Sequence, residues 1–162
     1  MTSRRDARKT GRRRARLALY PLLGAGLVSI FFLLPVQTLS VGERGPLWRV
    51  SPGDSFTLRY IHSMYGVEVR EIFRIGPEDF TLHGVESSPA ALEYFGIESP
   101  GPNNVRRTLK TFTVPAGSAG DHELRLNGCR VRLGAWGEEQ GRTTVSLARM
   151  SLIRYLRELL RR

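Results

Sequence analysis

A single run of twenty uncharged residues, 17–36, constrains this chain more than any other feature. A helix rises about 1.5 Å per residue, so this run would span roughly 30 Å, the thickness of the hydrocarbon core of a bilayer. No other segment of the sequence approaches this apolar length. The sequence therefore predicts one transmembrane helix over 17–36, through which the chain is bound to a membrane.

The residues before this run predict its orientation. Residues 1–16 contain eight Lys or Arg and one Asp, and basic residues beside a span stay on the cytoplasmic side. We therefore expect 1–16 to be a cytoplasmic tail and the remainder to lie outside the cytoplasm, in a single-pass protein of the cell membrane. The alternative is a cleaved signal peptide, but its apolar core is usually about 7–15 residues and ends in a small-residue cleavage site. Either interpretation places the domain outside.

The net charge of +10 is concentrated at the two ends of the chain. Residues 41–145 hold twelve basic and thirteen acidic side chains, so this part is nearly neutral. Proteins that bind nucleic acid usually carry a basic stripe on a folded face. The sequence therefore argues against nucleic acid as a partner.

Beyond the apolar run, the pattern changes to a period of two. Residues 56–62 (FTLRYIH) and 67–75 (VEVREIFRI) alternate between apolar and polar positions, which predicts two half-buried strands. The Ser-Met-Tyr-Gly step between them predicts a β-hairpin, with Gly66 providing a positive φ. Further strands are expected at 80–85, 108–114, 122–126, 130–133 and 143–147, with a type I′ turn at Asn127-Gly128. The pattern predicts a mainly β domain over 41–148, as a small antiparallel sandwich or an open barrel.

The sequence also predicts the structure of two further segments and the burial of the single cysteine. Residues 97–107 are rich in Gly, Pro and Asn and predict a loop. Residues 151–162 predict a C-terminal amphipathic helix, with its leucines on one side and its arginines on the other. That helix could pack on the β-domain, lie on anionic lipid or bind another protein, and packing on the domain is favoured. Cys129, the only cysteine, is expected to be buried in a strand.

Few residues suggest chemistry. The three histidines lack the spacing of metal ligands, and no motif predicts a cofactor or a catalytic constellation. His62 and Glu71 are ionisable residues at positions that alternation assigns to the apolar face. Hairpin geometry places them about 13 Å apart, at about 3.3 Å per residue, so they cannot touch. Structural roles are therefore favoured for both, and we expect His62 to be partly buried with a hydrogen bond.

The hairpin resembles one known family. Tyr60, His62, Ser63, Glu71 and Phe73 match the opening of the bacterial family termed domain of unknown function 1850, which shows an aromatic-x-His-Ser segment, a short turn and an acidic residue before an aromatic-rich strand. The Phe-Gly step at 95–96 resembles the next block of that family, after which the family continues Ala-Gly-Leu where this chain reads Ile-Glu-Ser. The resemblance covers roughly residues 55–97.

Members of this family are often encoded beside tripartite, periplasmic-receptor-dependent (TRAP) transporters of the TAXI type. The resemblance therefore implies an accessory role beside such a transporter or its solute receptor. It also marks His62, Ser63, Glu71, Phe95 and Gly96 as candidate binding residues.

Two functions follow from these patterns. The first is a membrane-anchored, extracytoplasmic accessory or binding module that is associated with a solute transporter. The alternative is an extracytoplasmic enzyme of unknown reaction, in which His62 acts as a base and Glu71 orients it or binds the substrate.

Overall fold

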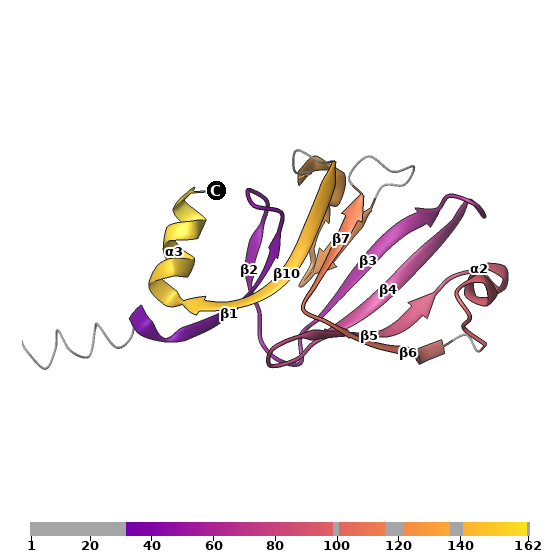
Figure 1. Cartoon of the computed structure of the whole chain (residues 1–162), viewed down its shortest axis with the longest axis horizontal. Helices are drawn as coiled ribbons and strands as arrows, with labels where there is room; N and C mark the ends of the chain where they lie inside the picture. The colour runs from indigo at the N-terminus through magenta and orange to yellow at the C-terminus, as the bar shows by residue number, and fades with distance from the viewer. Residues whose placement is uncertain (1–31, 99–100, 116–121, 137–140, 162) are drawn as a thin grey trace, which may run out of the picture.

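The computed structural model describes residues 32–98, 101–115, 122–136 and 141–161. In these ranges the chain forms two antiparallel sheets, which diverge from one another toward the end that carries α2 (Figure 1). The smaller sheet has the order β2-β1-β10-β7, and the larger has the order β6-β5-β4-β3-β8-β9. The strands are β1 (Pro35–Val41), β2 (Leu47–Arg49), β3 (Ser55–His62), β4 (Val67–Ile75), β5 (Phe80–Glu86), β6 (Gly101–Leu109), β7 (Thr111–Pro115), β8 (Glu123–Leu126), β9 (Cys129–Arg132) and β10 (Arg142–Ser151). The helices are α2 (Pro89–Tyr94), the 3-10 turn η1 (Leu133–Trp136) and α3 (Leu152–Arg161). The predicted mainly β, antiparallel fold is confirmed, and neither sheet closes into a barrel.

Two hairpins form where the sequence predicts them. β3 pairs with β4 from Ser55 opposite Arg74 to His62 opposite Val67, and the turn contains Gly66 at a φ of 62°. β8 pairs with β9 through Asn127 and Gly128, whose φ values of 49° and 83° are both positive, as a type I′ turn requires. In both cases local turn chemistry sets the register of the strands.

A cluster of phenylalanines joins the two sheets. Phe56 and Phe73 stack across the β3–β4 pair at a centroid distance of 4.7 Å, and Phe80 meets Phe56 edge-on at 5.4 Å. Phe112 comes from β7 of the smaller sheet and stacks on Phe73 at 5.4 Å. Apolar side chains from both sheets surround these rings: Leu39, Val41, Val50, Leu58, Ile75, Val114, Leu124, Leu126, Leu133 and Val145. The two sheets therefore share one hydrophobic core.

The N-terminal strand begins inside the segment that the sequence assigned to the membrane. Leu34 is a bend and Pro35 and Val36 belong to β1, so a helix over the full range 17–36 is wrong at its last three residues, and the β-domain begins at 35 rather than 41. Strand β1 was missed because residues 36–39 are all buried and therefore show no alternation. The remainder of the predicted helix before residue 32, and the basic tail 1–16, lie outside the described residues. Among the residues that the structure describes, no helix has the length and apolar character needed to cross a bilayer.

The segment between β5 and β7 also differs from the prediction. Residues 101–107, expected as a loop, form most of β6. The amide side chain of Asn104 accepts from the backbone N–H of Val85 and donates to its carbonyl, both at 2.9 Å, beside a register shift in β5. A side chain thus replaces backbone pairing, which a composition rich in turn residues does not reveal. The strand expected over 108–114 is two strands, because the chain passes from the larger to the smaller sheet at Lys110.

The C-terminal helix α3 follows β10 without an intervening loop. It contacts β1 and β10, but none of its side chains is buried, so the favoured prediction that its leucines pack on the domain is met only in part, at the partly shielded Leu152. Cys129 is likewise exposed rather than buried, because it opens β9 at the edge of the larger sheet.

Candidate functional site

The short helix α2 was not predicted, although its sequence carries the signals. Ser88 caps it: its hydroxyl accepts from the backbone N–H of Ala91 at 3.4 Å, and proline occupies the first turn. Gly96 has a φ of 71° and ends the helix with two backbone bonds, from its own N–H to Glu93 and from the next N–H to Leu92. This is the Schellman arrangement, so Gly96 has a backbone role.

Helix α2 is held against the larger sheet by its buried side. Leu92 is 3% exposed and packs in a small apolar cluster with Val69 of β4 and Val85 of β5. Tyr94 and Phe95, at the C-terminal end of the helix, are 56% and 37% exposed. The helix therefore projects two aromatic rings beside the turn of the β3–β4 hairpin.

These rings form a cluster with two others, which we call the aromatic tip: His62, Tyr65, Tyr94 and Phe95. The imidazole of His62 is the common member, with centroid distances of 5.3 Å to each of the other three rings. Tyr94 meets Tyr65 at 5.9 Å and Phe95 at 5.8 Å, both edge-on. Distances of 4.5–7 Å with tilted or edge-to-face geometry are those of favourable aromatic pairs. Two separate elements therefore form one aromatic cluster.

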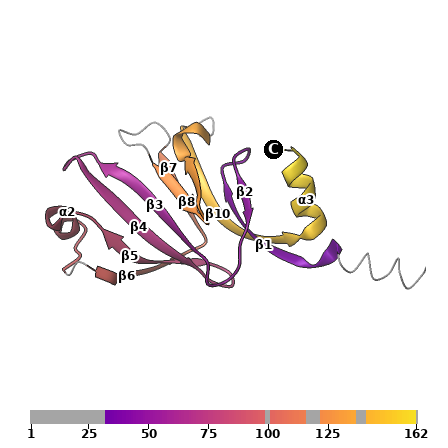
Figure 2. The ribbon, with the colours of Figure 1, turned by 180° about the vertical axis from the view of Figure 1, so that it is seen from behind.

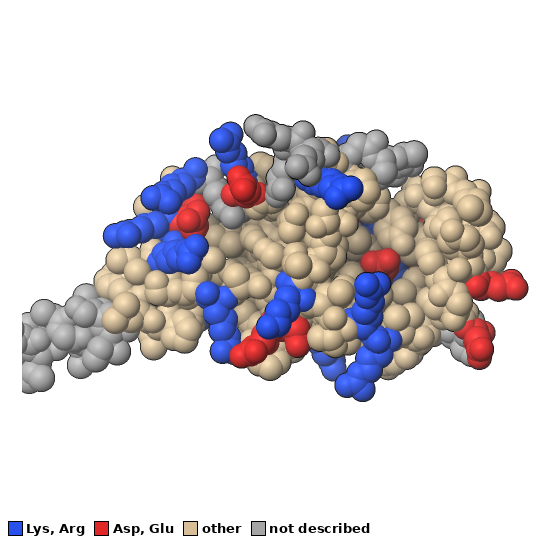
Figure 3. Space-filling model, viewed as in Figure 1, with Lys and Arg blue, Asp and Glu red and all other residues tan. Residues whose placement is uncertain are grey.

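The aromatic tip is open to solvent. Tyr65 is 40% exposed and Tyr94 is 56% exposed, and they are flanked in the hairpin by Met64, which is 66% exposed. The lobe at the α2 end of the molecule shows an uncharged surface in the space-filling view, with acidic atoms only at its outer edge (Figure 3). Contiguous exposed apolar surface of this kind is typical of interaction sites.

One polar atom lies within this cluster. The Nδ1 atom of His62 is enclosed and has no hydrogen-bond partner among the described residues. The hydrogen bond that the sequence predicted for His62 is therefore not seen at this nitrogen. Aromatic contacts, rather than polar ones, hold the ring in place.

Glu71 lies away from the aromatic tip. It pairs across the hairpin with Leu58, four positions from the pair of His62 with Val67, so the predicted separation of the two residues follows from the observed register. The carboxylate accepts a hydrogen bond from the hydroxyl of Tyr60 at 3.1 Å, and the Tyr60 ring stacks on His122 at 5.0 Å. Glu71 thus has a tyrosine partner rather than a histidine partner.

Burial governs the ionisation of this pair. Removal from water raises the pKa of Glu71 above its ordinary value, and the Tyr60 hydrogen bond and the charge of Arg107 only partly oppose that rise. Burial, together with the nearby carboxylate, also raises the pKa of Tyr60. The Tyr60 hydroxyl therefore stays protonated and remains a hydrogen-bond donor to Glu71.

The structure thus divides the predicted binding residues. His62 and Phe95 lie together in the aromatic tip, whereas Ser63 is exposed in the hairpin turn and Gly96 shapes the end of α2. The sequence did not identify Tyr65 and Tyr94 as site residues. The tyrosine in the turn and the Tyr-Phe-Gly step were both visible, but only the tertiary structure brings them together.

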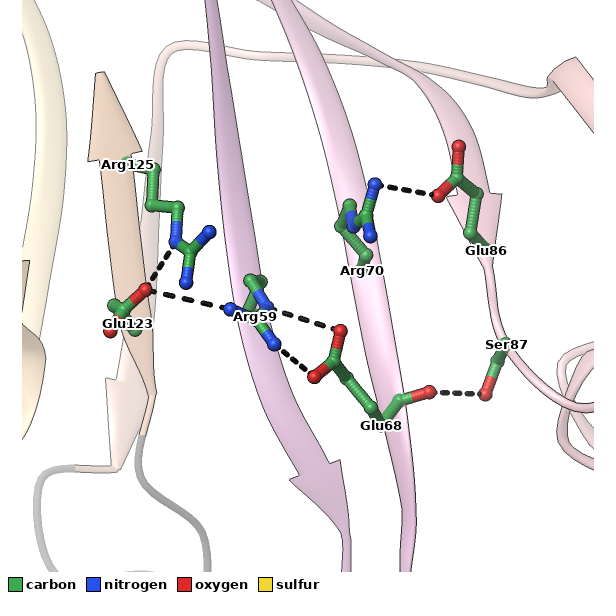
Figure 4. Close-up of polar contacts among 7 residues, drawn as sticks. All are labelled: Arg59, Glu68, Arg70, Glu86, Ser87, Glu123 and Arg125. Atoms are coloured by element: carbon green, nitrogen blue, oxygen red, sulfur yellow. Dashed lines mark hydrogen bonds and ion pairs between the residues drawn. The ribbon is translucent and has the colours of Figure 1, made fainter. Parts of the chain in front are cut away.

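The outer face of the larger sheet carries paired charges (Figure 4). Arg59 of β3 bonds to Glu68 of β4 with its Nε at 3.1 Å from Oε1, and this hydrogen bond holds the pKa of Glu68 below its ordinary value. Arg70 pairs with Glu86 at 3.0 Å, and Arg125 pairs with Glu123 along β8. A shallow hollow of about 190 Å³ lies over part of this face. Exposed pairs of this kind contribute little stability, and Arg130 and Arg132 of β9 share the same face by register.

Among the described residues, no group of three His, Cys, Asp or Glu side chains is arranged to hold a metal ion. Comparison of the chain with protein-family models, curated proteins and solved structures found no match. Function must therefore be argued from the geometry of the chain itself.

Proposed function

We propose that this chain is a membrane-anchored, extracytoplasmic binding module that docks a protein partner through its aromatic tip. The observation that carries the proposal is the gathering of four rings, from the β3–β4 turn and from α2, at one exposed end of the molecule. The hydrophobic core does not require these exposed rings, and an exposed aromatic cluster lowers the solubility of a protein.

The residue types at the tip are those that protein interfaces favour. Tyrosine, phenylalanine and methionine are enriched in the centres of interfaces, and the aromatic side chains among them bury a large area at little cost in side-chain entropy. Met64 adds a flexible apolar side chain beside the rings. The enclosed Nδ1 of His62 offers one polar atom that a partner could reach through a small shift of the hairpin turn.

The position of the tip suits an anchored module. Seen from behind, α2 and the hairpin turn lie at one end of the molecule, whereas α3 and the start of β1 lie at the other (Figure 2). If the apolar run before residue 35 crosses the membrane, the aromatic tip is directed away from the lipid. The resemblance of residues 55–97 to the domain of unknown function 1850 family supports a TRAP-type transporter subunit or its solute receptor as the partner.

The alternative, an enzyme that uses His62 and Glu71 together, has less support. Their separation along the hairpin is about 13 Å, and each has a different neighbour: aromatic rings for His62 and the Tyr60 hydroxyl for Glu71. No observed contact joins them into one site.

Site-specific photocrosslinking tests the docking proposal. A benzophenone amino acid placed at Tyr94 should form an adduct with the transporter subunit or the solute receptor in cells. The same group at Thr113, an exposed position of β7, serves as a control and should form none. Adducts of equal yield from both positions, or none with these partners from Tyr94, would contradict the proposal.

Substitution of the tyrosines in the aromatic tip provides a second test of the docking proposal. Tyr65→Ala with Tyr94→Ala should weaken binding to the crosslinked partner at least about tenfold, since central aromatic residues of interfaces contribute more than about 1 kcal/mol each. Trp136→Ala is the matched control, because that ring is 39% exposed but lies outside the aromatic tip. Undiminished binding by the tyrosine variant would place the interface elsewhere.

A further inference from the structure

Helix α3 carries an apolar arc that the described residues leave partly exposed. On a helical wheel, its apolar residues fill an arc of roughly 160°: Leu152, Ile153, Tyr155, Leu156, Leu159 and Leu160. Arg154, Arg157 and Arg161 lie on the opposite arc. Leu156 is 40% exposed, Leu159 is 43% exposed and Leu160 is 89% exposed, so this part of the arc is open to its surroundings.

The side of α3 that faces the β-domain does not coincide with this arc. The partly shielded residues are Leu152, Tyr155 and Glu158, which lie on one flank of the helix. Leu156 and Leu160, near the middle and far side of the arc, point away from that flank. The described part of the chain thus shields mainly one edge of the apolar surface, and the remainder is available to another apolar environment.

The start of α3 is fixed beside the end of the predicted membrane span. The backbone N–H of Leu152 donates to the carbonyl of Leu34 at 3.0 Å, and Ser151 pairs with Pro35. Leu33 and Leu34, the last apolar residues before β1, are 68% and 48% exposed. If the preceding run crosses the bilayer, the first turn of α3 lies at the membrane surface, and its ten residues extend about 15 Å from that point.

We propose that α3 lies in the surface of a bilayer that contains anionic lipid, with its leucines in the headgroup–acyl boundary and its arginines on lipid phosphates. The arginines supply the charge complementarity, since the only acidic residue of the helix is Glu158, which lies 3.8 Å from Arg161. Lys and Arg atoms gather over this end of the molecule (Figure 3). Amphipathic helices of this composition bind at such boundaries about 5–10 Å deep.

This placement gives the domain a second membrane contact. A single span leaves the domain free to tilt, whereas a span and an adjoining surface helix fix its orientation. The proposal concerns lipid rather than a protein partner, so it does not depend on the function of the aromatic tip.

Depth measurements in the full chain test the proposal. With Cys129→Ser as background, Leu156→Cys and Leu160→Cys place a fluorophore on the apolar arc, and Arg157→Cys places it on the opposite arc as the matched control. The chain is reconstituted into vesicles of phosphatidylcholine with phosphatidylglycerol, and into phosphatidylcholine alone. Brominated acyl chains should quench the label at 156 and 160 severalfold more strongly than at 157, and more in anionic than in neutral vesicles.

The remaining outcomes would overturn the proposal. Equal quenching at 156 and 157 would show that the arc does not face lipid. Labels at 156 that are shielded from both brominated lipid and aqueous iodide would show that protein covers the arc, either residues 17–31 or a second copy.

Arg154→Gln with Arg157→Gln should abolish the difference between anionic and neutral vesicles. A preference that survives this change would refute the role of the arginines.

Discussion

Replacing His62 changes two opposing contributions to the free energy of unfolding, and the size of each follows from the observed contacts and their general magnitudes. The ring makes three aromatic contacts at 5.3 Å, each worth about 0.5–1.5 kcal/mol. Because Tyr94 and Tyr65 are partly exposed, the lower end applies, and the three contacts together contribute about 1.5–2 kcal/mol. The enclosed Nδ1 without a partner opposes this by about 1 kcal/mol, the lower end of the cost of an unsatisfied polar group.

These magnitudes predict different results for two variants. His62→Ala loses the contacts and the unsatisfied nitrogen, so it should lower the free energy of unfolding by about 1 kcal/mol. His62→Phe keeps a ring and removes the nitrogen, so it should raise that free energy by about 1 kcal/mol.

Urea denaturation of the purified chain, followed by the fluorescence of Trp48, measures both variants. Trp48 is a partly buried probe that packs against the shared core. A loss of stability in His62→Phe as large as in His62→Ala would refute the reasoning, because it would show that Nδ1 is hydrogen-bonded in solution. Reduced partner binding by the more stable His62→Phe variant would show that the nitrogen serves recognition.

Four further predictions concern other parts of the chain. A reporter that works only outside the cytoplasm should be active when fused after the last residue, and activity of a cytoplasmic reporter alone would reverse the proposed orientation. Burial raises the pKa of Glu71 above its ordinary value of 4.5. The contribution of the protonated Glu71 carboxyl group to the free energy of unfolding is therefore fully present below that pH, and it is lost as the pH rises through the raised pKa. Glu71→Gln keeps an acceptor for Tyr60, and thermal unfolding should show it more stable than the unmodified chain at neutral pH but not at pH values well below 4.5; an advantage that is independent of pH would contradict the assignment. Phe73→Ala should cost about 3–5 kcal/mol in denaturation experiments, because this ring is 2% exposed between the two sheets, and a loss below 1 kcal/mol would mean that the core repacks. Leu156→Asp should leave the melting temperature of the chain in detergent nearly unchanged, because that side chain is 40% exposed; a large drop would show that the helix packs on the domain.

Local patterns in the sequence predicted the elements whose side chains alternate or whose turns need special backbone angles. The β3–β4 register was predictable because Gly66 ends a short turn and one face of each strand is apolar. The Asn127-Gly128 turn was predictable because few residue pairs tolerate two positive φ values. The separation of His62 from Glu71 followed from the same register.

Other features depended on contacts between segments far apart in the chain. Strand β1 lies between β10 and β2 and is buried at four successive positions, so both of its faces are covered, and no local period reports such burial. The Asn104 side chain that completes the pairing of β6 is indistinguishable in sequence from a loop asparagine.

The candidate site shows the same division. The alternation of β3 placed His62 on the apolar face at the end of the strand, and its residue type marked it as unusual there. Tyr94 and Phe95 lie about thirty residues away, and they meet His62 only because Leu92 seats α2 on β4 and β5. Sequence alone determined the β3–β4 and β8–β9 hairpins and which face of β3 and β4 is apolar, since these properties depend on neighbouring residues. The tertiary structure alone decided that the aromatic tip exists and that the described elements leave Leu156 and Leu160 of α3 exposed, because both depend on how distant elements pack.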